Sequence, residues 1–498
     1  MLVHQLIYQG AADQTAFVSR QIVTYKQLQD QVKLYRNFFF QQGVRPGNNV
    51  GLFAKNSVEF VYSYLAIISL GAVVVPLNFQ LVVREIAFIV QNAQMETLVT
   101  MGRLELADEL RNCGYAPELR QLVIPEFAAA PQLQDIPEAG VEQAKDPKAV
   151  CTIIYTSGTT GTPKGAMLTH GNLISNAAAF SQMSGVAGHD NVLCVLPMYH
   201  CFAWTCAVLV PLLNGASVTI LEAFTRDAVV TIRNTGITAI FGIPTMYKLL
   251  ATWGTAMDFQ RVRLCVSGGS SLPQKIFQQF FRRTGKNIVE GYGLSEASPV
   301  VTLNPLDKVK VGSIGKPLPQ IAVRIVTADG GIASIGEIGE LLVCGPSVMA
   351  GYFNLPEETA QTIREGWLHT GDLAYWDDEG YLYVVDRLKD MIITSGENVY
   401  PREIEELLYA FPGVAEASVI GISDKLRGNA VYAYVVMEDG GTLDKKSLRE
   451  FLQANLAPYK VPREVIQVQS LPKNSTGKIL KRVLREQVEI LQNNENVM

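Results

Sequence analysis

The chain has few cysteines, few histidines and no excess of positive charge, and each shortage excludes a class of protein. Seven cysteines are scattered along 498 residues without a CxxC pair, and five histidines show no metal-ligand spacing. We therefore expect reduced thiols, as in the cytoplasm, and no zinc site. A net charge of −5 gives no general attraction to nucleic acid, so an anionic ligand would need a local site.

Long uncharged runs are also scarce. The run from Phe60 to Leu77 has the length of a membrane span. Its polar residues and the β-branched segment Ala72–Pro76 favour a buried helix followed by a buried strand instead. The N-terminus does not have the build of a signal peptide. We therefore predict a cytoplasmic protein without an integral membrane segment.

The chain is too long for a single hydrophobic core, because such cores stop growing at about 250–300 residues. Helical and strand-like segments alternate up to residue 100 and again after residue 151, which is typical of doubly wound parallel sheets. Short strands separated by Gly and Pro follow residue 311, and mixed helices and strands end the chain.

This pattern predicts an α/β fold with two domains. The large N-terminal domain (1–386) would hold two doubly wound lobes and a small β-barrel-like subdomain. A smaller, mobile α+β domain would follow a hinge, with a fixed appendage as the alternative. The expected limits are 1–170 and 171–310 for the lobes, 311–386 for the subdomain, 387–391 for the hinge and 392–498 for the C-terminal domain.

A Gly- and Thr-rich segment, Tyr155–Gly165, follows the apolar strand predicted for Val150–Ile154 and precedes a helical stretch. Its glycines let the backbone curl, and its hydroxyl groups and Lys164 can donate to phosphate. It is not a Walker A loop, because Gly158 and Gly161 are too close together. A flexible linker is the alternative.

Together with the motifs that follow it, this loop resembles the signature of the adenylate-forming superfamily. That superfamily comprises acyl-CoA synthetases, luciferases and peptide-synthetase adenylation domains, and the resemblance is closest to fatty acyl-CoA synthetases. It extends from about Tyr25 to Lys481. The further motifs occur in the family's order: Leu196–His200, Gly291–Glu296, Gly366–Asp372, Asp386–Asp390 and Pro472–Lys478.

The resemblance implies a site for ATP and Mg²⁺. Tyr292 would stack on adenine, while Asp372 and Arg387 would bind the ribose. Glu296 and Thr156 would bind the metal. The alternatives are that Tyr292 is a core residue, that Glu296 is a solvated charge in a turn, and that Asp372 caps a turn. The implied ATP- or AMP-binding residues are Thr156, Ser157, Gly158, Thr159, Thr160, Gly161, Gly291, Tyr292, Gly293, Ser295, Asp372 and Arg387.

The implied catalytic residues are Lys478, His200, Glu296 and Lys164. Lys478 would bridge the attacking carboxylate and the α-phosphate, two anions that need a cation between them. One lysine of a solvated basic face is the alternative. His200 would gate the approach of the thiol, unless it is a packed histidine at a strand end.

A second conformation is implied for thioester formation. The small domain would rotate about Lys389, and a loop with Ser395, Gly396 and Glu397 would bind CoA. Gly396 would leave room for the pantetheine arm.

The acyl pocket is the least determined part of the site. By family position its residues are Phe202, Trp204, Gly242, Met246, Gly268, Gly269 and Ser298. The glycines would leave room for an extended chain, and Trp204 would shorten the pocket. Core packing explains Phe202, Trp204 and Met246 equally well.

We therefore predict a ligase that activates a medium- or long-chain fatty acid with ATP and transfers the acyl group to CoA, releasing AMP. The alternatives are an aryl-CoA ligase, an enzyme that loads a carrier-protein thiol or uses oxygen as luciferases do, and a nucleotide-binding pseudo-enzyme. The expected partners are the carboxylic acid, ATP and CoA, with no nucleic acid. Peripheral contact with lipid is left open, since long-chain acids partition into membranes.

Overall fold

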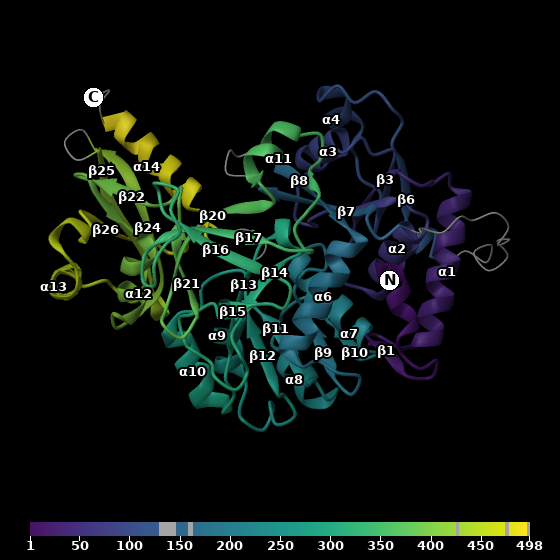
Figure 1. Cartoon of the computed structure of the whole chain (residues 1–498), viewed down its shortest axis with the longest axis horizontal. Helices are drawn as coiled ribbons and strands as arrows, with labels where there is room; N and C mark the ends of the chain where they lie inside the picture. The colour runs from purple at the N-terminus through teal and green to yellow at the C-terminus, as the bar shows by residue number, and fades with distance from the viewer. Residues whose placement is uncertain (129–145, 158–162, 425–427, 474–477, 496–498) are drawn as a thin grey trace.

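The structure is a computed structural model that describes residues 1–128, 146–157, 163–424, 428–473 and 478–495. Its large N-terminal domain holds two mixed sheets and a curled half-barrel of short strands, and a small C-terminal domain follows (Figure 1). The predicted α/β fold class is confirmed. The mobility of the C-terminal domain stays a prediction.

The larger sheet has nine strands. Strands β9 to β13 pair in parallel, β1 joins them in parallel through β10, and β2, β14 and β15 are antiparallel to their neighbours. In spatial order the strands are β15 (Lys316–Pro317), β14 (Val300–Leu303), β13 (Val289–Gly293), β12 (Leu264–Ser267), β11 (Ala239–Gly242), β9 (Asn191–Cys194), β10 (Ser217–Ile220), β1 (Thr15–Val18) and β2 (Ile22–Thr24).

The second sheet has seven strands. In spatial order these are β18 (Gly351–Tyr352), β8 (Pro163–Thr169), β7 (Val150–Ser157), β4 (Val73–Pro76), β3 (Asn49–Phe53), β5 (Thr97–Thr100) and β6 (Arg120–Val123). Strand pairing in both sheets crosses the lobe limits expected at residues 170 and 310, because β1 and β2 join the first sheet and β18 joins the second. Strand pairings between residues so far apart in the chain leave no local signal in the amino-acid sequence, so the sequence did not predict them.

The uncharged run forms helix α2 (Val58–Ser69) and strand β4. Eleven of the twelve α2 residues are buried, and all four residues of β4 are. This confirms the prediction of a buried helix and a buried strand. No helix among the described residues is long and apolar enough to cross a membrane.

The Gly- and Thr-rich segment lies between two strands. Strand β7 leads into it, and β8 returns antiparallel with Thr156 opposite Lys164. The sequence predicted that a helical stretch follows the segment, and α6 (His170–Ser184) does so after β8. The helix begins where the Thr169 hydroxyl accepts from the Asn172 amide at 3.0 Å. The strand β8 itself was not predicted.

The half-barrel and the C-terminal domain contain the remaining strands. The half-barrel has β16 (Ala322–Val326), β17 (Gly339–Cys344), β20 (Trp367–Trp376), β19 (Ile363–Arg364) and β21 (Leu382–Arg387). The C-terminal domain has the hairpin β22 (Ile392–Thr394) and β23 (Glu397–Val399) and the sheet β24 (Val414–Asp424), β25 (Gly428–Met437) and β26 (Glu464–Gln467). Figure 1 shows this sheet at the opposite end of the molecule from β3 and β6.

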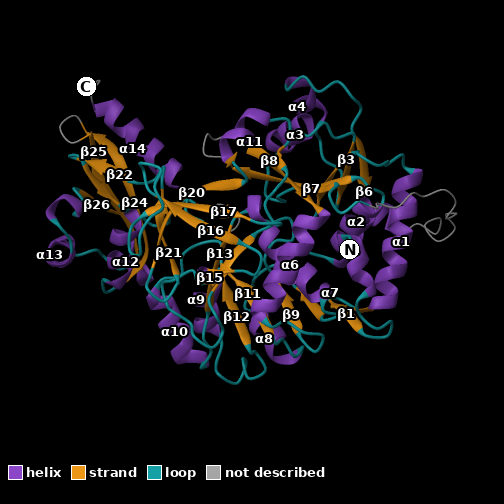
Figure 2. Cartoon of the chain, viewed as in Figure 1, coloured by secondary structure: helices purple, strands orange, loops and turns teal. Residues whose placement is uncertain are grey.

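Helices cover the sheets, as Figure 2 shows. In the N-terminal domain they are α1 (Tyr25–Gln41), α3 (Val83–Asn92), α4 (Ala107–Asn112), α5 (Ile124–Ala128), a π-helix (Ala203–Leu209), α7 (Val210–Leu213), α8 (Asp227–Asn234), α9 (Pro244–Trp253), α10 (Gln274–Thr284) and α11 (Pro356–Thr362). The C-terminal domain has α12 (Pro401–Ala410), α13 (Lys445–Asn455) and α14 (Lys481–Glu495). Short 3₁₀ helices cover Val3–Tyr8, Ser295–Ala297, Glu438–Gly440 and Pro458–Lys460.

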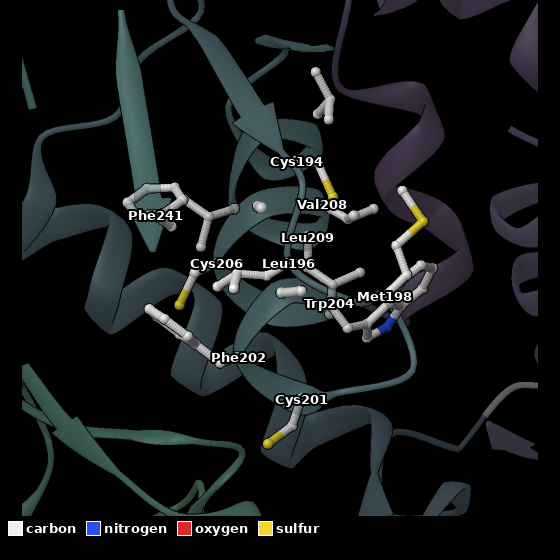
Figure 3. Packing of buried hydrophobic residues seen from close by; sticks show 14 of the residues in the cluster. Cys194, Leu196, Met198, Cys201, Phe202, Trp204, Cys206, Val208, Leu209 and Phe241 are labelled. Carbon is white, nitrogen blue, oxygen red and sulfur yellow. The ribbon is translucent and has the colours of Figure 1, made fainter. Parts of the chain in front are cut away.

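One apolar core joins the two large sheets, and the C-terminal domain has separate cores. The π-helix contributes to the large core beside β9 and β11 (Figure 3). All seven cysteines are free, and five of them are buried. Separate apolar cores for the two domains are expected for a chain of this length, because a single core stops growing at about 250–300 residues.

Candidate active site

Three of the predicted nucleotide-binding side chains form one cluster. Tyr292 is the next-to-last residue of β13, Asp372 lies on β20, and Arg387 ends β21 directly opposite Asp372. The Tyr292 hydroxyl donates to Asp372 Oδ2, and Arg387 Nε lies 3.2 Å from Asp372 Oδ1. The carboxylate is only 4% exposed, so its charge is stabilised by these two donors. A ribose arriving here would meet an already oriented carboxylate and guanidinium.

The glycines of the same motif are required by the backbone. A Cβ at Gly293 would lie 2.0 Å from the Pro299 carbonyl oxygen, and one at Gly291 would lie 3.0 Å from that of Thr302. Thr302 lies on β14, and Pro299 directly precedes that strand. Strand β14 pairs with β13. These two positions therefore bring β14 close behind Tyr292, and no side chain would fit at Gly293.

Glu296 lies on the 3₁₀ helix after β13, where its side chain accepts from the Tyr352 hydroxyl at 2.9 Å. The Lys164 ammonium lies 5.4 Å from the centroid of the Tyr352 ring, within the range of a cation–π contact. Thr156 faces Lys164 across the β7–β8 pair. Glu296 and Lys164 therefore both contact Tyr352, and Thr156 lies opposite Lys164.

This donor set fits a hard divalent cation. Mg²⁺ takes oxygen ligands, and Glu296 and Thr156 offer a carboxylate and a hydroxyl. Oε1 of Glu296 accepts from Tyr352, while no hydrogen bond or ion pair from the described residues occupies Oε2. Ser157 is the last residue of β7, and Gly158, Thr159, Thr160 and Gly161 lie outside the described residues.

His200 is partly buried next to the nucleotide cluster. Burial, and secondly the charge of Lys478, lower its pKa to about 4, so it is neutral at neutral pH. Its Nδ1 accepts from the Phe202 amide at 3.3 Å. The next residue, Cys201, places Sγ 3.2 Å from the Ser295 hydroxyl oxygen. His200, the predicted gate for the thiol, therefore lies next to the predicted nucleotide-binding motif Gly291–Glu296.

Lys478 lies near the same cluster although it belongs to the C-terminal domain. Burial, and secondly the positive charge of Arg387, lower its pKa to about 8, and Asp372 and Asp390 oppose the shift. Two ion pairs anchor the helix that follows it: Arg485 Nη2 lies 2.7 Å from Asp390 Oδ1, and Lys481 Nζ lies 2.8 Å from Glu405 Oε1. The C-terminal domain thus presents Lys478 to the side of the nucleotide cluster that Arg387 occupies.

Four of the predicted acyl-pocket residues lie together. Gly242 ends β11, Gly268 follows β12, and the Gly268 amide donates to the Gly242 carbonyl at 3.1 Å. The Phe202 ring comes within 3.2 Å of the position of a Cβ on Gly268, and Met246 Cε within 3.4 Å of one on Gly242. The Cβ positions of these glycines are therefore closely packed by the side chains of Phe202, Met246 and Tyr247.

The other three lie differently. Trp204 points away from Phe202 in Figure 3, and its ring centroid lies 3.9 Å from that of Tyr64 on α2. Its position is that of a core residue, because a helix side chain two residues from Phe202 faces another direction. Ser298 is fully buried and donates to the Ser347 carbonyl at 2.8 Å. Gly269 has a positive φ of 80° beside Ile243.

The predicted CoA loop is not brought to this cluster. Ser395 and Gly396, with φ of 52° and 87°, form the exposed turn of the β22–β23 hairpin, and Glu397 is exposed beside them. A Cβ at Gly396 would meet nothing within 4 Å, so here the turn and not crowding requires glycine. Lys389 lies in the exposed turn that follows β21.

Tyr352 is the site residue that the sequence did not predict. Its motif, Gly351-Tyr352, gives no more signal than any aromatic beside a glycine. The signal that could have found it is spatial: β18 must pair with β8 before Tyr352 reaches Glu296.

Comparisons with known proteins agree with this arrangement. Residues 6–353 match the family model of the AMP-binding enzymes, and residues 403–478 match that of the AMP-binding enzyme C-terminal domain. The feruloyl-CoA synthase of Amycolatopsis sp is 37% identical, with 93% of each chain covered. A long-chain-fatty-acid–CoA ligase of Bacillus subtilis is 34% identical, with 95% of this chain and 92% of that one covered.

Solved structures are similar over the same length. ATP-bound MatB from Rhodopseudomonas palustris is 31% identical and superposes with a TM-score of 0.90, covering 98% of this chain and 99% of that one. Apo MatB, with equal coverage, superposes at 0.79. MenE from B. subtilis in complex with ATP and magnesium is 30% identical, with a TM-score of 0.87 and coverage of 98% and 99%.

The chain therefore belongs to the family of AMP-binding enzymes, the adenylate-forming superfamily that its motifs resemble. It is an AMP-forming acid–CoA ligase.

Proposed function

We propose that this ligase activates a medium- or long-chain fatty acid with ATP to an acyl-adenylate and pyrophosphate, and then transfers the acyl group to CoA with release of AMP. The observation that supports the substrate class is that the side chains packed against Gly242 and Gly268, at the ends of β11 and β12, are all uncharged: Phe202, Met246 and Tyr247. An aliphatic chain binds such a surface by burial of apolar area alone.

The first step joins two anions. The carboxylate of the acid is ionised at neutral pH and attacks the α-phosphorus, and pyrophosphate leaves. Lys478 lies between carboxylate and phosphate and stabilises the charge that they share in the transition state. Tyr292, Asp372 and Arg387 hold the nucleoside, and Lys164 contacts the outer phosphates. Glu296 and Thr156 would hold Mg²⁺, which when bound would neutralise charge on the triphosphate.

The second step needs another face of the C-terminal domain. Rotation within residues 387–391, about Lys389, withdraws Lys478 and brings Ser395, Gly396 and Glu397 to the site. The pantetheine sulfur then attacks the acyl carbonyl, and AMP leaves with the electrons of the broken bond. His200 is neutral and controls the access of the thiol to the acyl-adenylate. The superposition on ATP-bound MatB, better than on apo MatB, supports an adenylation arrangement for the present structure.

An aryl-CoA ligase is the second candidate, favoured by the 37% identity to a feruloyl-CoA synthase. The Phe202 ring beside Gly268 would give an aromatic acid a ring to pack against. One or two side chains decide between such substrates, which makes the choice one for measurement.

The test is AMP release with ATP, Mg²⁺ and CoA over a panel of acids. Acetate, octanoate and palmitate would be compared with benzoate, ferulate and several amino acids. A rate of AMP release that rises toward octanoate or palmitate supports the fatty-acid proposal. A maximal rate with ferulate or benzoate replaces it with the function of an aryl-CoA ligase. If no AMP is released with CoA, but AMP is released when a carrier protein is added, the acceptor is a carrier-protein thiol.

A further inference from the structure

Tyr352 connects two elements that are distant in sequence but adjacent in the site. Its hydroxyl donates to Glu296 Oε1 at 2.9 Å, and its ring lies 5.4 Å from Lys164 Nζ. The side chain is only 9% exposed. One phenol therefore touches the carboxylate with the donor chemistry for Mg²⁺ and the lysine next to the phosphate segment.

The position of Tyr352 is fixed from several sides. Strand β18 pairs it with Ala166 of β8, and its amide donates to the Thr359 hydroxyl at 2.8 Å. The amide of the next residue, Phe353, donates to the Gly165 carbonyl at 2.8 Å. A phenol held this way loses little further entropy when it orients a neighbour.

The same short segment also holds the backbone of Glu296. The Met349 amide donates to the Glu296 carbonyl at 2.8 Å, while Tyr352 holds the carboxylate. Glu296 is thus fixed at both ends by residues 349–352.

We infer that Tyr352 is a positioning residue that fixes the Glu296 carboxylate and the Lys164 ammonium for metal-bound ATP. With Oε1 taken by the phenol, Oε2 of Glu296 is directed as a single ligand to Mg²⁺, and Lys164 is held over the ring beside the phosphates. The inference rests on the proposed use of Mg·ATP, but on neither the acid nor the thiol acceptor.

The experiment is calorimetric titration of ATP into the enzyme without any acid, once with Mg²⁺ and once with EDTA. For Tyr352→Phe we expect Mg·ATP to bind about tenfold more weakly, which corresponds to the loss of one hydrogen bond to a charged group. Metal-free ATP should bind within about twofold of the parent, because the ring beside Lys164 remains. The matched control is Tyr383→Phe, which removes a phenol–carboxylate hydrogen bond to Asp377 at 3.3 Å elsewhere in the half-barrel.

A double-mutant cycle completes the test. Glu296→Gln alone should weaken Mg·ATP, and adding Tyr352→Phe to it should weaken Mg·ATP no further. Equal losses with and without metal, unchanged Mg·ATP binding in Tyr352→Phe, or an undiminished effect in the Glu296→Gln background would each overturn the inference. Because no acid is present, failure of the substrate proposal leaves this result unaffected.

Discussion

The nucleotide cluster and the C-terminal residues of the site are built in different ways. Asp372 and Arg387 face each other as cross-strand partners, and Tyr292 reaches the same carboxylate from a neighbouring sheet. Lys478 follows a segment outside the described residues, and Ser395 and Gly396 occupy an exposed hairpin turn. The first group is organised by sheet formation itself. The second depends on where a separate domain with its own core is placed.

This difference predicts that substitutions in the first group weaken nucleotide binding, while substitutions in the second change one half-reaction. The largest effect should come from Lys478→Ala. Removing the cation from the shared charge should slow ATP–pyrophosphate exchange by about 10²–10³-fold. Thioester formation from supplied acyl-adenylate should stay within a few-fold of the parent. Full exchange activity in Lys478→Ala would contradict the proposed role.

Asp372→Asn should act on nucleotide affinity in both half-reactions. The amide keeps the shape but removes the charge that Arg387 and the Tyr292 hydroxyl surround, so about 2 kcal/mol of binding should be lost for ATP and for AMP. Titration of each nucleotide measures this. A loss confined to ATP would show that the cluster binds phosphates and not the nucleoside.

The pH dependence of adenylation should sharpen the same contrast. Lys478 has a pKa lowered to about 8 in the free enzyme. It is charged below that pH and loses the proton above it, so kcat/KM for adenylation should fall about tenfold per pH unit above 8. Lys478→Arg, whose guanidinium stays charged, should remove this fall even if its absolute rate is lower. An unchanged alkaline limb in Lys478→Arg would assign the pKa to another group.

The smallest effect is expected at the hairpin. Gly396 has a φ of 87°, so Gly396→Ala should cost about 1 kcal/mol in strain at the turn. We expect adenylation to remain within twofold and thioester formation to slow several-fold, measured by single-turnover kinetics on preformed acyl-adenylate. Gly380→Ala, at a φ of 76° in a turn of the half-barrel, is the matched control for strain alone. If Gly396→Ala slows both half-reactions equally, Gly396 has only a structural role and the proposed role in CoA binding is contradicted.

Much of the fold could be predicted because its signals are local. The charge-free run predicted the buried helix α2 and the buried strand β4. The motifs likewise placed Tyr292, Asp372 and Arg387 in one site. The strand β8 was missed because the short stretch Pro163–Thr169 has neither a strand-like alternation nor several β-branched residues. The Tyr352–Glu296 contact and the pairing of β1 with β10 were missed because they depend on long-range pairing. Trp204 was assigned by motif position, which cannot show the direction of a side chain in a π-helix.

Arg387 is both the partner of Asp372 and the last residue of β21, immediately before the turn with Lys389. The residue proposed to hold the nucleoside is therefore the first residue of the proposed hinge. Because Arg387 would contact the nucleoside and also begin the hinge, we expect AMP to leave as the C-terminal domain returns. We then expect AMP to be the last product to leave and to inhibit competitively toward ATP.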